Sequence, residues 1–182
     1  MGLIGRWVLV SLFIFLSYVS VAQTPGMDSA RINVIKAGMV NGFTAYTTWP
    51  DMDNEIPFVI GVMGHDKLFI PALKRFFEKK PVFGGRAINI REIIADDAVK
   101  CHVVVILGDA NQYAANILSQ VANRPILTIS DRENFAQSGG HVNFYNQNNK
   151  LRFEVNWQST TNSKLKVSSR LLRLARVVGK PK

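Results

Sequence analysis

The sequence predicts an α/β domain: a mostly parallel mixed sheet with helices on both faces, in a Rossmann-like three-layer sandwich, and a C-terminal β-hairpin plus helix. Two apolar runs, 58–63 and 103–107, are continuous, as in strands that are buried on both faces of a parallel sheet. Helical patterns alternate with these strands, which favours three layers. Residues 142–145 and 151–155 alternate between apolar and polar positions, which predicts an antiparallel hairpin at the edge of the sheet.

The N-terminal segment has the features of a secretory signal peptide. Arg6 supplies a positive charge, segment 7–19 is almost entirely apolar, and Ser20-Val21-Ala22 has the small-x-small pattern of a cleavage site. The apolar run falls short of the roughly 20 residues that a membrane-spanning helix needs. We therefore expect residues 1–22 to be removed on export to the periplasm and residues 23–182 to form a single domain.

The mature chain begins with the pattern of a helix, a strand and a second helix. Asp28 or Ser29 caps the first helix, which should end before Trp49-Pro50 because a residue that precedes proline avoids the α region. After the strand at 58–63, Asp66 caps the second helix. The expected inward faces are Ile32, Ile35, Met39, Phe43 and Tyr46 on the first helix, and Leu68, Leu73, Phe76 and Phe77 on the second.

The middle of the chain continues the alternation. Gly84-Gly85 marks a turn, and 87–93 alternates as a half-buried strand does. The strand at 103–107 is followed by a helix that Asp109 caps. The apolar residues expected on the inward face of that helix are Tyr113, Ile117, Leu118 and Val121.

The last third should contain a strand, two helices and the hairpin. The strand covers 125–129, and a short helix starts at Ser130 or Asp131. It ends at Gly139-Gly140, because glycine suits the left-handed residue that follows a helix. The final helix is expected over 167–178. Its inward residues would be Leu171, Leu172, Leu174, Ala175 and Val178, and its outward residues Arg170, Arg173 and Arg176.

Two polar groups in this region are candidates for contact with a partner or ligand. Arg152 and Glu154 share a strand face, and with Asn143 they would line a polar patch or pocket, although a solvated sheet face explains the same pattern. The outward arginines of the last helix form either a solvated face or a basic docking surface for an acidic partner or a lipid surface. The candidate face is therefore Asn143, Arg152, Glu154, Arg170, Arg173 and Arg176.

No residue pattern predicts a catalytic, cofactor or metal site. Gly61 and Gly64 follow the first strand, but they do not complete a dinucleotide-binding fingerprint and are better explained by a tight turn. Cys101, the only cysteine, is expected to pack as a small buried side chain, with an intermolecular disulfide as the alternative. Simpler structural roles in turns or in packing are expected for the other chemically capable residues: His65, Asp96, Asp97, His102, Ser138 and His141.

The charge of the chain narrows the class of partner. The formal net charge is +9, and it falls to +8 when Arg6 leaves with the signal peptide. An exported protein is not expected to meet nucleic acid. Its basic surface favours anionic lipid headgroups, cell-wall polymers or an acidic protein surface, unless the charge serves only solubility.

Several short segments, taken in order, carry a family resemblance. They are KA at 36–37 through Phe43 to WP at 49–50, GR at 85–86, CHV at 101–103, RPILT at 124–128, GGHVNF at 139–144, RFEVN at 152–156 and the stretch 165–175. Together they resemble the YfiR family of exported bacterial regulators. The segments are spread over nearly the whole mature chain.

The resemblance implies a periplasmic α/β domain, often a homodimer, with no active site and no cofactor of its own. Its partner would be the periplasmic region of a membrane-anchored diguanylate cyclase, whose synthesis of cyclic-di-GMP it represses. An outer-membrane lipoprotein would relieve that repression by sequestering the repressor. Two alternatives stay open: a ligand-binding sensor module for a histidine kinase or other membrane receptor, and an exported enzyme with an unrecognised site.

Overall fold

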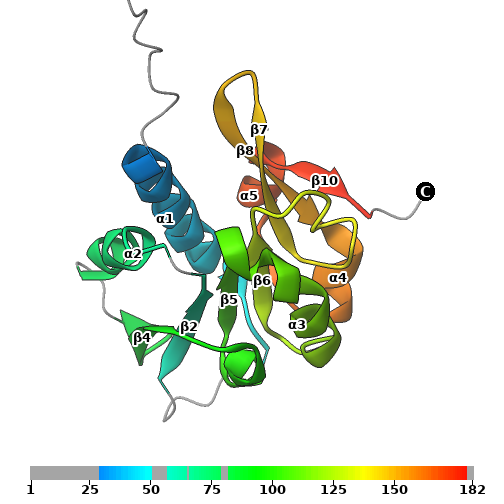
Figure 1. Ribbon diagram of the computed structural model, residues 1–182. Coiled ribbons are helices and arrows are strands. Elements are labelled where there is room, and N and C mark those ends of the chain that lie inside the picture. Colours follow the sequence, from blue (N-terminus) through cyan, green and yellow to red (C-terminus); the bar gives the residue numbers. More distant parts are fainter. Residues whose placement is uncertain (1–28, 51–56, 65, 79–81, 180–182) are drawn as a thin grey trace, which may run out of the picture.

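The structure is a computed structural model that describes residues 29–50, 57–64, 66–78 and 82–179 (Figure 1). The expected signal peptide, the cap Asp28 and His65 lie outside these residues. The main sheet has eight described strands in the order β10-β8-β7-β6-β5-β2-β4-β3. They are β2 (Phe58–Met63), β3 (Val82–Phe83), β4 (Arg86–Glu92), β5 (Val103–Ile106), β6 (Leu127–Ser130), β7 (Val142–Gln147), β8 (Lys150–Asn156) and β10 (Arg176–Val178).

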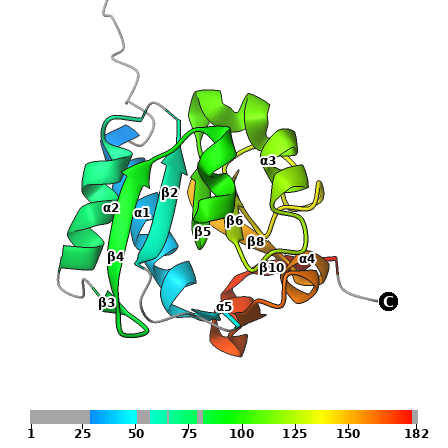
Figure 2. The ribbon, with the colours of Figure 1, turned by 90° about the horizontal axis from the view of Figure 1, so that it is seen from below.

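The predicted fold class is confirmed. All neighbouring pairs from β4 across to β7 are parallel, whereas β8 pairs antiparallel with β7 and β3 pairs antiparallel with β4. Helices α1 (Ser29–Ala45) and α2 (Phe69–Glu78) lie on one side of the sheet, and α3 (Ala114–Gln120) lies on the other (Figure 2). The protein is therefore a mixed, mostly parallel sheet between two layers of helices.

The apolar core divides into one cluster on each face of the sheet. Along β5, Val103 and Val105 belong to the cluster beneath α1 and α2, whereas Val104 and Ile106 belong to the cluster beneath α3. Every residue of β5 is buried, as its continuous apolar sequence predicts. This central strand is thus covered on both sides.

The inward face of α1 differs from the predicted one. The helix ends at Ala45, before Trp49-Pro50 as expected, but Ile32, Ile35 and Met39 are only half-buried and Tyr46 is exposed. Phe43 is buried as predicted, and the other side chains that pack inward are Asn33, Ala37, Val40 and Thr44. Small and polar residues allow α1 to lie close to its neighbours, and a pattern of large apolar residues does not reveal such a face.

The predicted inward faces of α2 and α3 are right in part. Asp66 caps α2 as predicted, because its Oδ1 accepts hydrogen bonds from the backbone N–H groups of Leu68 and Phe69. Leu68 and Phe76 are exposed, so only Leu73 and Phe77 of the expected set are buried. Before α3, a short 3₁₀ helix η2 (Gly108–Tyr113) holds Asp109 in its first turn rather than at a cap, and Tyr113 is exposed.

The short helix predicted between Ser130 and Gly139 is a series of turns. Asn134 has a φ of 57°, a left-handed conformation that a right-handed helix cannot contain. Gly139, at a φ of 103°, does occupy the conformation that favours glycine. Glycine is required at position 140 for a different reason: a Cβ there would clash with the ring of the fully buried Phe135.

Replacing Gly139 by valine should lower the free energy of unfolding by about 2 kcal/mol, because a β-branched residue is strained at this φ even though the space around it is open. Gly42→Val is a matched control, since Gly42 lies inside α1 with nothing near its Cβ position. Urea unfolding of both variants checks the prediction. Equal stabilities of the Gly139 variant and the wild type would show that the backbone relaxes at no cost.

The predicted hairpin is present and longer than expected. Gln147 pairs with Lys150, so the turn consists of Asn148 and Asn149 alone, at φ values of 51° and 56°. Two consecutive left-handed residues match the twist of the two strands and make a tight hairpin turn. The hairpin does not form the sheet edge, however, because β10 pairs parallel with β8 outside it.

The C-terminal helix is much shorter than predicted. Helix α5 covers only Ser169–Leu174. The next residue, Ala175, is extended, and Arg176 begins β10. Leu171 is buried as expected, but Leu174 is 74% exposed. Ser168 caps α5 by accepting a hydrogen bond from the backbone N–H of Leu171.

Several short elements have no counterpart in the prediction. Helix α4 (Trp157–Asn162) follows β8 and is capped by Asn156, whose side chain accepts from the N–H of Ser159. Strands β1 (Thr47–Thr48) and β9 (Lys166–Val167) pair antiparallel in a separate two-stranded sheet. A further 3₁₀ helix, η1 (Ala95–Lys100), connects β4 to β5.

Candidate functional site

The order of the strands creates a crevice at one end of the sheet. Strand β2 lies between β5 and β4, and the chain passes from β2 to β4 through α2 on one face. From β5 it passes to β6 through α3 on the other face. The two connections therefore diverge at the carboxyl ends of β2 and β5, which is where open α/β sheets bind their ligands.

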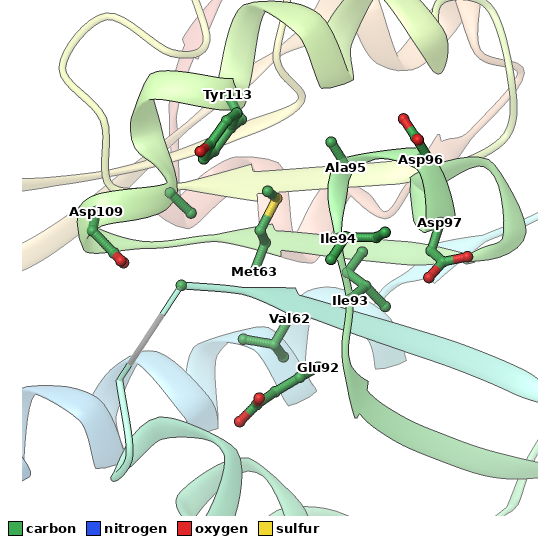
Figure 3. A pocket seen from close by; sticks show the side chains of 12 residues that line it. Val62, Met63, Glu92, Ile93, Ile94, Ala95, Asp96, Asp97, Asp109 and Tyr113 are labelled. Atoms are coloured by element: carbon green, nitrogen blue, oxygen red, sulfur yellow. The ribbon is translucent and has the colours of Figure 1, made fainter.

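A cleft of about 660 Å³ occupies this position. Its walls come from the end of β2, the end of β4 with η1, and η2 (Figure 3). Val62, Met63, Ile93 and Ala110 are its buried apolar residues. The apolar side chains that it exposes are Ile94, at 67%, and Tyr113, at 47%.

Acidic side chains give this cleft its electrostatic character. Glu92, Asp96, Asp97 and Asp109 line it, and among the residues that the structure describes no lysine, arginine or histidine does. Asp97 lies 2.8 Å from the Lys100 ammonium, whose hydrogen bond and charge lower the pKa of the carboxyl. The sequence predicts that Asp96 and Asp97 lie in a turn, and in the structure they belong to the first turn of η1.

Close packing explains both glycines: Gly61 lies inside β2, and Gly64 lies in the bend that follows it, where a tight turn is predicted. A Cβ on Gly64 would meet the backbone oxygen of Leu107, and a Cβ on Gly61 would meet Ile93 and Cys101. Gly64 also has a φ of 124°. The surrounding carboxylates would repel a phosphate group, so the segment lacks the charge that a phosphate cradle needs.

Asn143 and Glu154 share a sheet face as predicted, but both are buried. The Asn143 amide nitrogen donates to the backbone oxygens of Ser130, Arg132 and Phe144, and its Oδ1 accepts from the N–H of Phe135. These bonds tie the turns after β6 to β7. Asn143 therefore holds these turns against β7. Together with Glu154 and Arg176 it also lines a pocket of about 380 Å³, so two of the three residues of the expected polar pocket, Asn143 and Glu154, lie together there, whereas Arg152 does not line it.

Glu154 forms an ion pair with Arg176 across neighbouring strands. Its side chain is 1% exposed, and its Oε2 accepts from Arg176 Nε at 2.8 Å and also from Arg176 Nη2. The guanidinium lies over the ring of Tyr145, 4.2 Å from its centroid, and the bond to Glu154 raises the pKa of Arg176. Arg152 lies opposite Tyr145 and is exposed.

The three arginines of the predicted basic surface are separated by the structure. Arg170 and Arg173 are exposed on α5, next to the exposed Leu174. Arg176 lies on β10, where it pairs with Glu154 rather than extending the same helical face. A docking surface at α5 consequently contains two of the three arginines.

Cys101 and His141 are buried, as the packing interpretation predicts. Burial raises the pKa of the Cys101 thiol to about 11, so the thiolate is scarce at neutral pH. Burial lowers the pKa of His141 to about 4. His141 Nδ1 lies 3.2 Å from the backbone N–H of Thr128, so its proton lies on Nε2, which donates to Ser163 Oγ. Both residues are components of the core.

The comparisons with known proteins identify the chain at the level of family. The profile of the YfiR/HmsC-like family matches residues 33–176. The chain belongs to the YfiR/HmsC-like family. Proteins of this family are periplasmic and regulatory rather than catalytic, they act in diguanylate cyclase signalling, and they interact with a membrane-associated partner. No curated protein sequence matches the chain.

The solved structures that resemble this YfiR/HmsC-like chain include a conserved domain protein from Vibrio cholerae, with a TM-score of 0.51 and 9% identity. The match covers 80% of this chain but 59% of the solved one. At this identity the likeness shows the fold alone. None of the helices that the structure describes is both long enough and apolar enough to cross a bilayer.

The cleft in this YfiR/HmsC-like chain is the feature that sequence reasoning missed. Glu92 and Asp96 lie at and after the end of β4 and Asp109 lies after β5, and all three line one cleft because β4 and β5 flank the same strand. A signal was available: polar residues that follow buried strands of a parallel sheet gather at its carboxyl end. The strand order needed to combine them could not be read from the sequence.

Proposed function

We propose that the protein is an exported regulator, without catalytic activity, that binds the periplasmic region of a membrane-anchored diguanylate cyclase and represses cyclic-di-GMP synthesis. The family match over residues 33–176 is the observation that supports this most. A cleaved signal peptide at residues 1–22 would deliver the domain to the compartment of that partner. Such a regulator needs a surface with different affinities for two states of the cyclase.

The outer face of α5 is the surface that best fits this role. Arg170 and Arg173 are one helical turn apart and exposed, and Leu174 beside them is 74% exposed. An apolar side chain flanked by two guanidinium groups is suited to a partner surface that combines a carboxylate with an apolar contact. Arg152 on the hairpin is a further exposed cation and is included in the proposal as a separate contact.

Reversing the charges of α5 should weaken binding without unfolding the domain. We expect Arg170→Glu/Arg173→Glu to raise the Kd for the cyclase domain at least about tenfold, which corresponds to about 1.4 kcal/mol, with no change in melting temperature. Biolayer interferometry with immobilised periplasmic domains of the organism's membrane-anchored cyclases measures this. Lys74→Glu/Arg75→Glu on the exposed side of α2 is the matched control.

The same assay separates the alternatives. Binding to the periplasmic domain of a histidine kinase, and to no cyclase domain, would identify a sensor module instead. The observation that favours a sensor module is the cleft at the carboxyl ends of the strands, where such sheets bind ligands. Equal affinities of the α5 variant and the wild type would show that this face is merely solvated. The proposal also includes a homodimer and an outer-membrane lipoprotein that sequesters the repressor, to be tested by sedimentation and by competition with the cyclase domain.

A further inference from the structure

We propose that the cleft at the carboxyl ends of β2, β4 and β5 binds a small organic cation: an amine carried on an apolar body. The inference does not depend on the proposed partner. It rests on the position of the cleft, on its apolar wall and on the sign of its charge, and each of these is a separate observation.

The size and the wall of the cleft suit a small molecule. A volume of about 660 Å³ lies within the usual range for ligand sites, and the cleft opens at the switch point of the sheet. Ile94 is 67% exposed at this site although it follows directly on the buried Ile93. Ile94 and Tyr113 are exposed to water in the protein alone, and a bound apolar group would cover them.

The charge of the wall selects a cation. The chain has 22 lysines and arginines against 13 aspartates and glutamates, yet the described residues that line this cleft include four carboxylates and no basic side chain. Glu92 and Asp96 are exposed within it, whereas the Lys100 ammonium offsets the charge of Asp97. The cleft therefore has the opposite sign to the protein as a whole, and it attracts cations while disfavouring anions.

The apolar wall favours an organic cation over a metal ion. Within the described ranges, no three His, Cys, Asp or Glu side chains are grouped so that they could hold a metal. A metal ion would also leave Ile94 and Tyr113 without a role. An amine with an aliphatic or aromatic body matches both parts, because the ammonium meets the carboxylates and the Tyr113 ring can pack against the body or the charge.

Three probes that share a phenylethyl group test the sign of the charge: 2-phenylethylamine, 2-phenylethanol and 3-phenylpropanoate. Isothermal titration of the mature protein should give a Kd below about 1 mM for the amine and a value at least about tenfold weaker for the alcohol. No binding of the propanoate is expected. The proposal is wrong if the amine does not bind, or if the amine and the alcohol bind equally.

Variants place the binding in the cleft. Glu92→Gln/Asp96→Asn should weaken the amine at least about tenfold, and Tyr113→Ala should weaken the amine and the alcohol alike. Glu78→Gln/Glu133→Gln removes two carboxylates elsewhere and should leave the Kd unchanged. An unchanged Kd in the Glu92/Asp96 variant would place the amine at another site. Stoichiometric displacement of the amine by calcium chloride would identify a metal site. Either result overturns the proposal.

Discussion

Acidification should destabilise the protein between about pH 6.5 and 4, chiefly through His141. Burial lowers the pKa of His141 from 6.5 to about 4. The unfolded chain takes up this proton below pH 6.5, whereas the folded protein resists it, so the contribution is complete above 6.5 and is lost as the pH falls towards 4. At about 1.4 kcal/mol per pKa unit, the loss is about 3 kcal/mol.

The surroundings of His141 explain the direction of the shift. A second proton would sit on Nδ1, which accepts a hydrogen bond from the backbone N–H of Thr128 at 3.2 Å. Protonated Nδ1 would then be a donor that faces this N–H donor. Burial and then the charge of Arg86 lower the pKa of His102 to about 4 as well. His102 is less deeply buried, so we expect a smaller contribution in the same pH range.

Urea unfolding at several pH values tests this prediction. His141→Gln should be less stable than the wild type at neutral pH, but its stability should fall about 3 kcal/mol less between pH 6.5 and 4, because glutamine does not titrate. Carboxylates contribute the same slope to both proteins. An NMR titration that gives His141 its ordinary pKa, or equal slopes in the two proteins, would contradict the account.

The second large effect is expected at Arg176. Arg176→Ala should cost about 3 kcal/mol, because it leaves the carboxylate of Glu154 buried without its ion-pair partner. It also removes the guanidinium from the ring of Tyr145 and loosens β10 from β8. For the same reason, reversing Arg170, Arg173 and Arg176 together would unfold the edge of the sheet and could not report on docking alone.

A double-mutant cycle isolates the ion pair. Glu154→Leu/Arg176→Ala should recover a large part of the lost stability, since it removes the buried charge as well as its partner. Arg173→Ala, on the exposed face of α5, should change stability by less than about 0.5 kcal/mol. If Arg176→Ala is as mild as Arg173→Ala, Glu154 is solvated in solution and the structural role assigned to the pair is wrong.

Long apolar runs made the architecture predictable. Strands β2 and β5 are continuous runs of apolar residues that only a sheet covered on both faces can bury, and they identify the parallel centre of the fold. The hairpin was predictable because its alternation matches the sheet period and its turn residues tolerate a positive φ.

Local patterns failed where tertiary contacts decide the conformation. The leucines and arginines of 170–178 recur with a helical spacing, but the pairing of Arg176 with Glu154 and of β10 with β8 favours a strand. Helix α4 was not predicted because its sequence, WQSTTN, has no apolar periodicity, and its cap, Asn156, is also the last residue of β8. Four of the six residues of the predicted partner face remain on the surface, and Asn143 and Glu154 are buried.

The central claim is that this protein represses a membrane-anchored cyclase by contact. The most direct measurement is the rate of cyclic-di-GMP synthesis by membranes that contain the full-length cyclase, with the mature protein added on the periplasmic side. The wild type should lower the rate, and Arg170→Glu/Arg173→Glu at the same concentration should not. An unchanged rate with the wild type would contradict the proposed function, and equal repression by the variant would contradict the assignment of the docking face to α5.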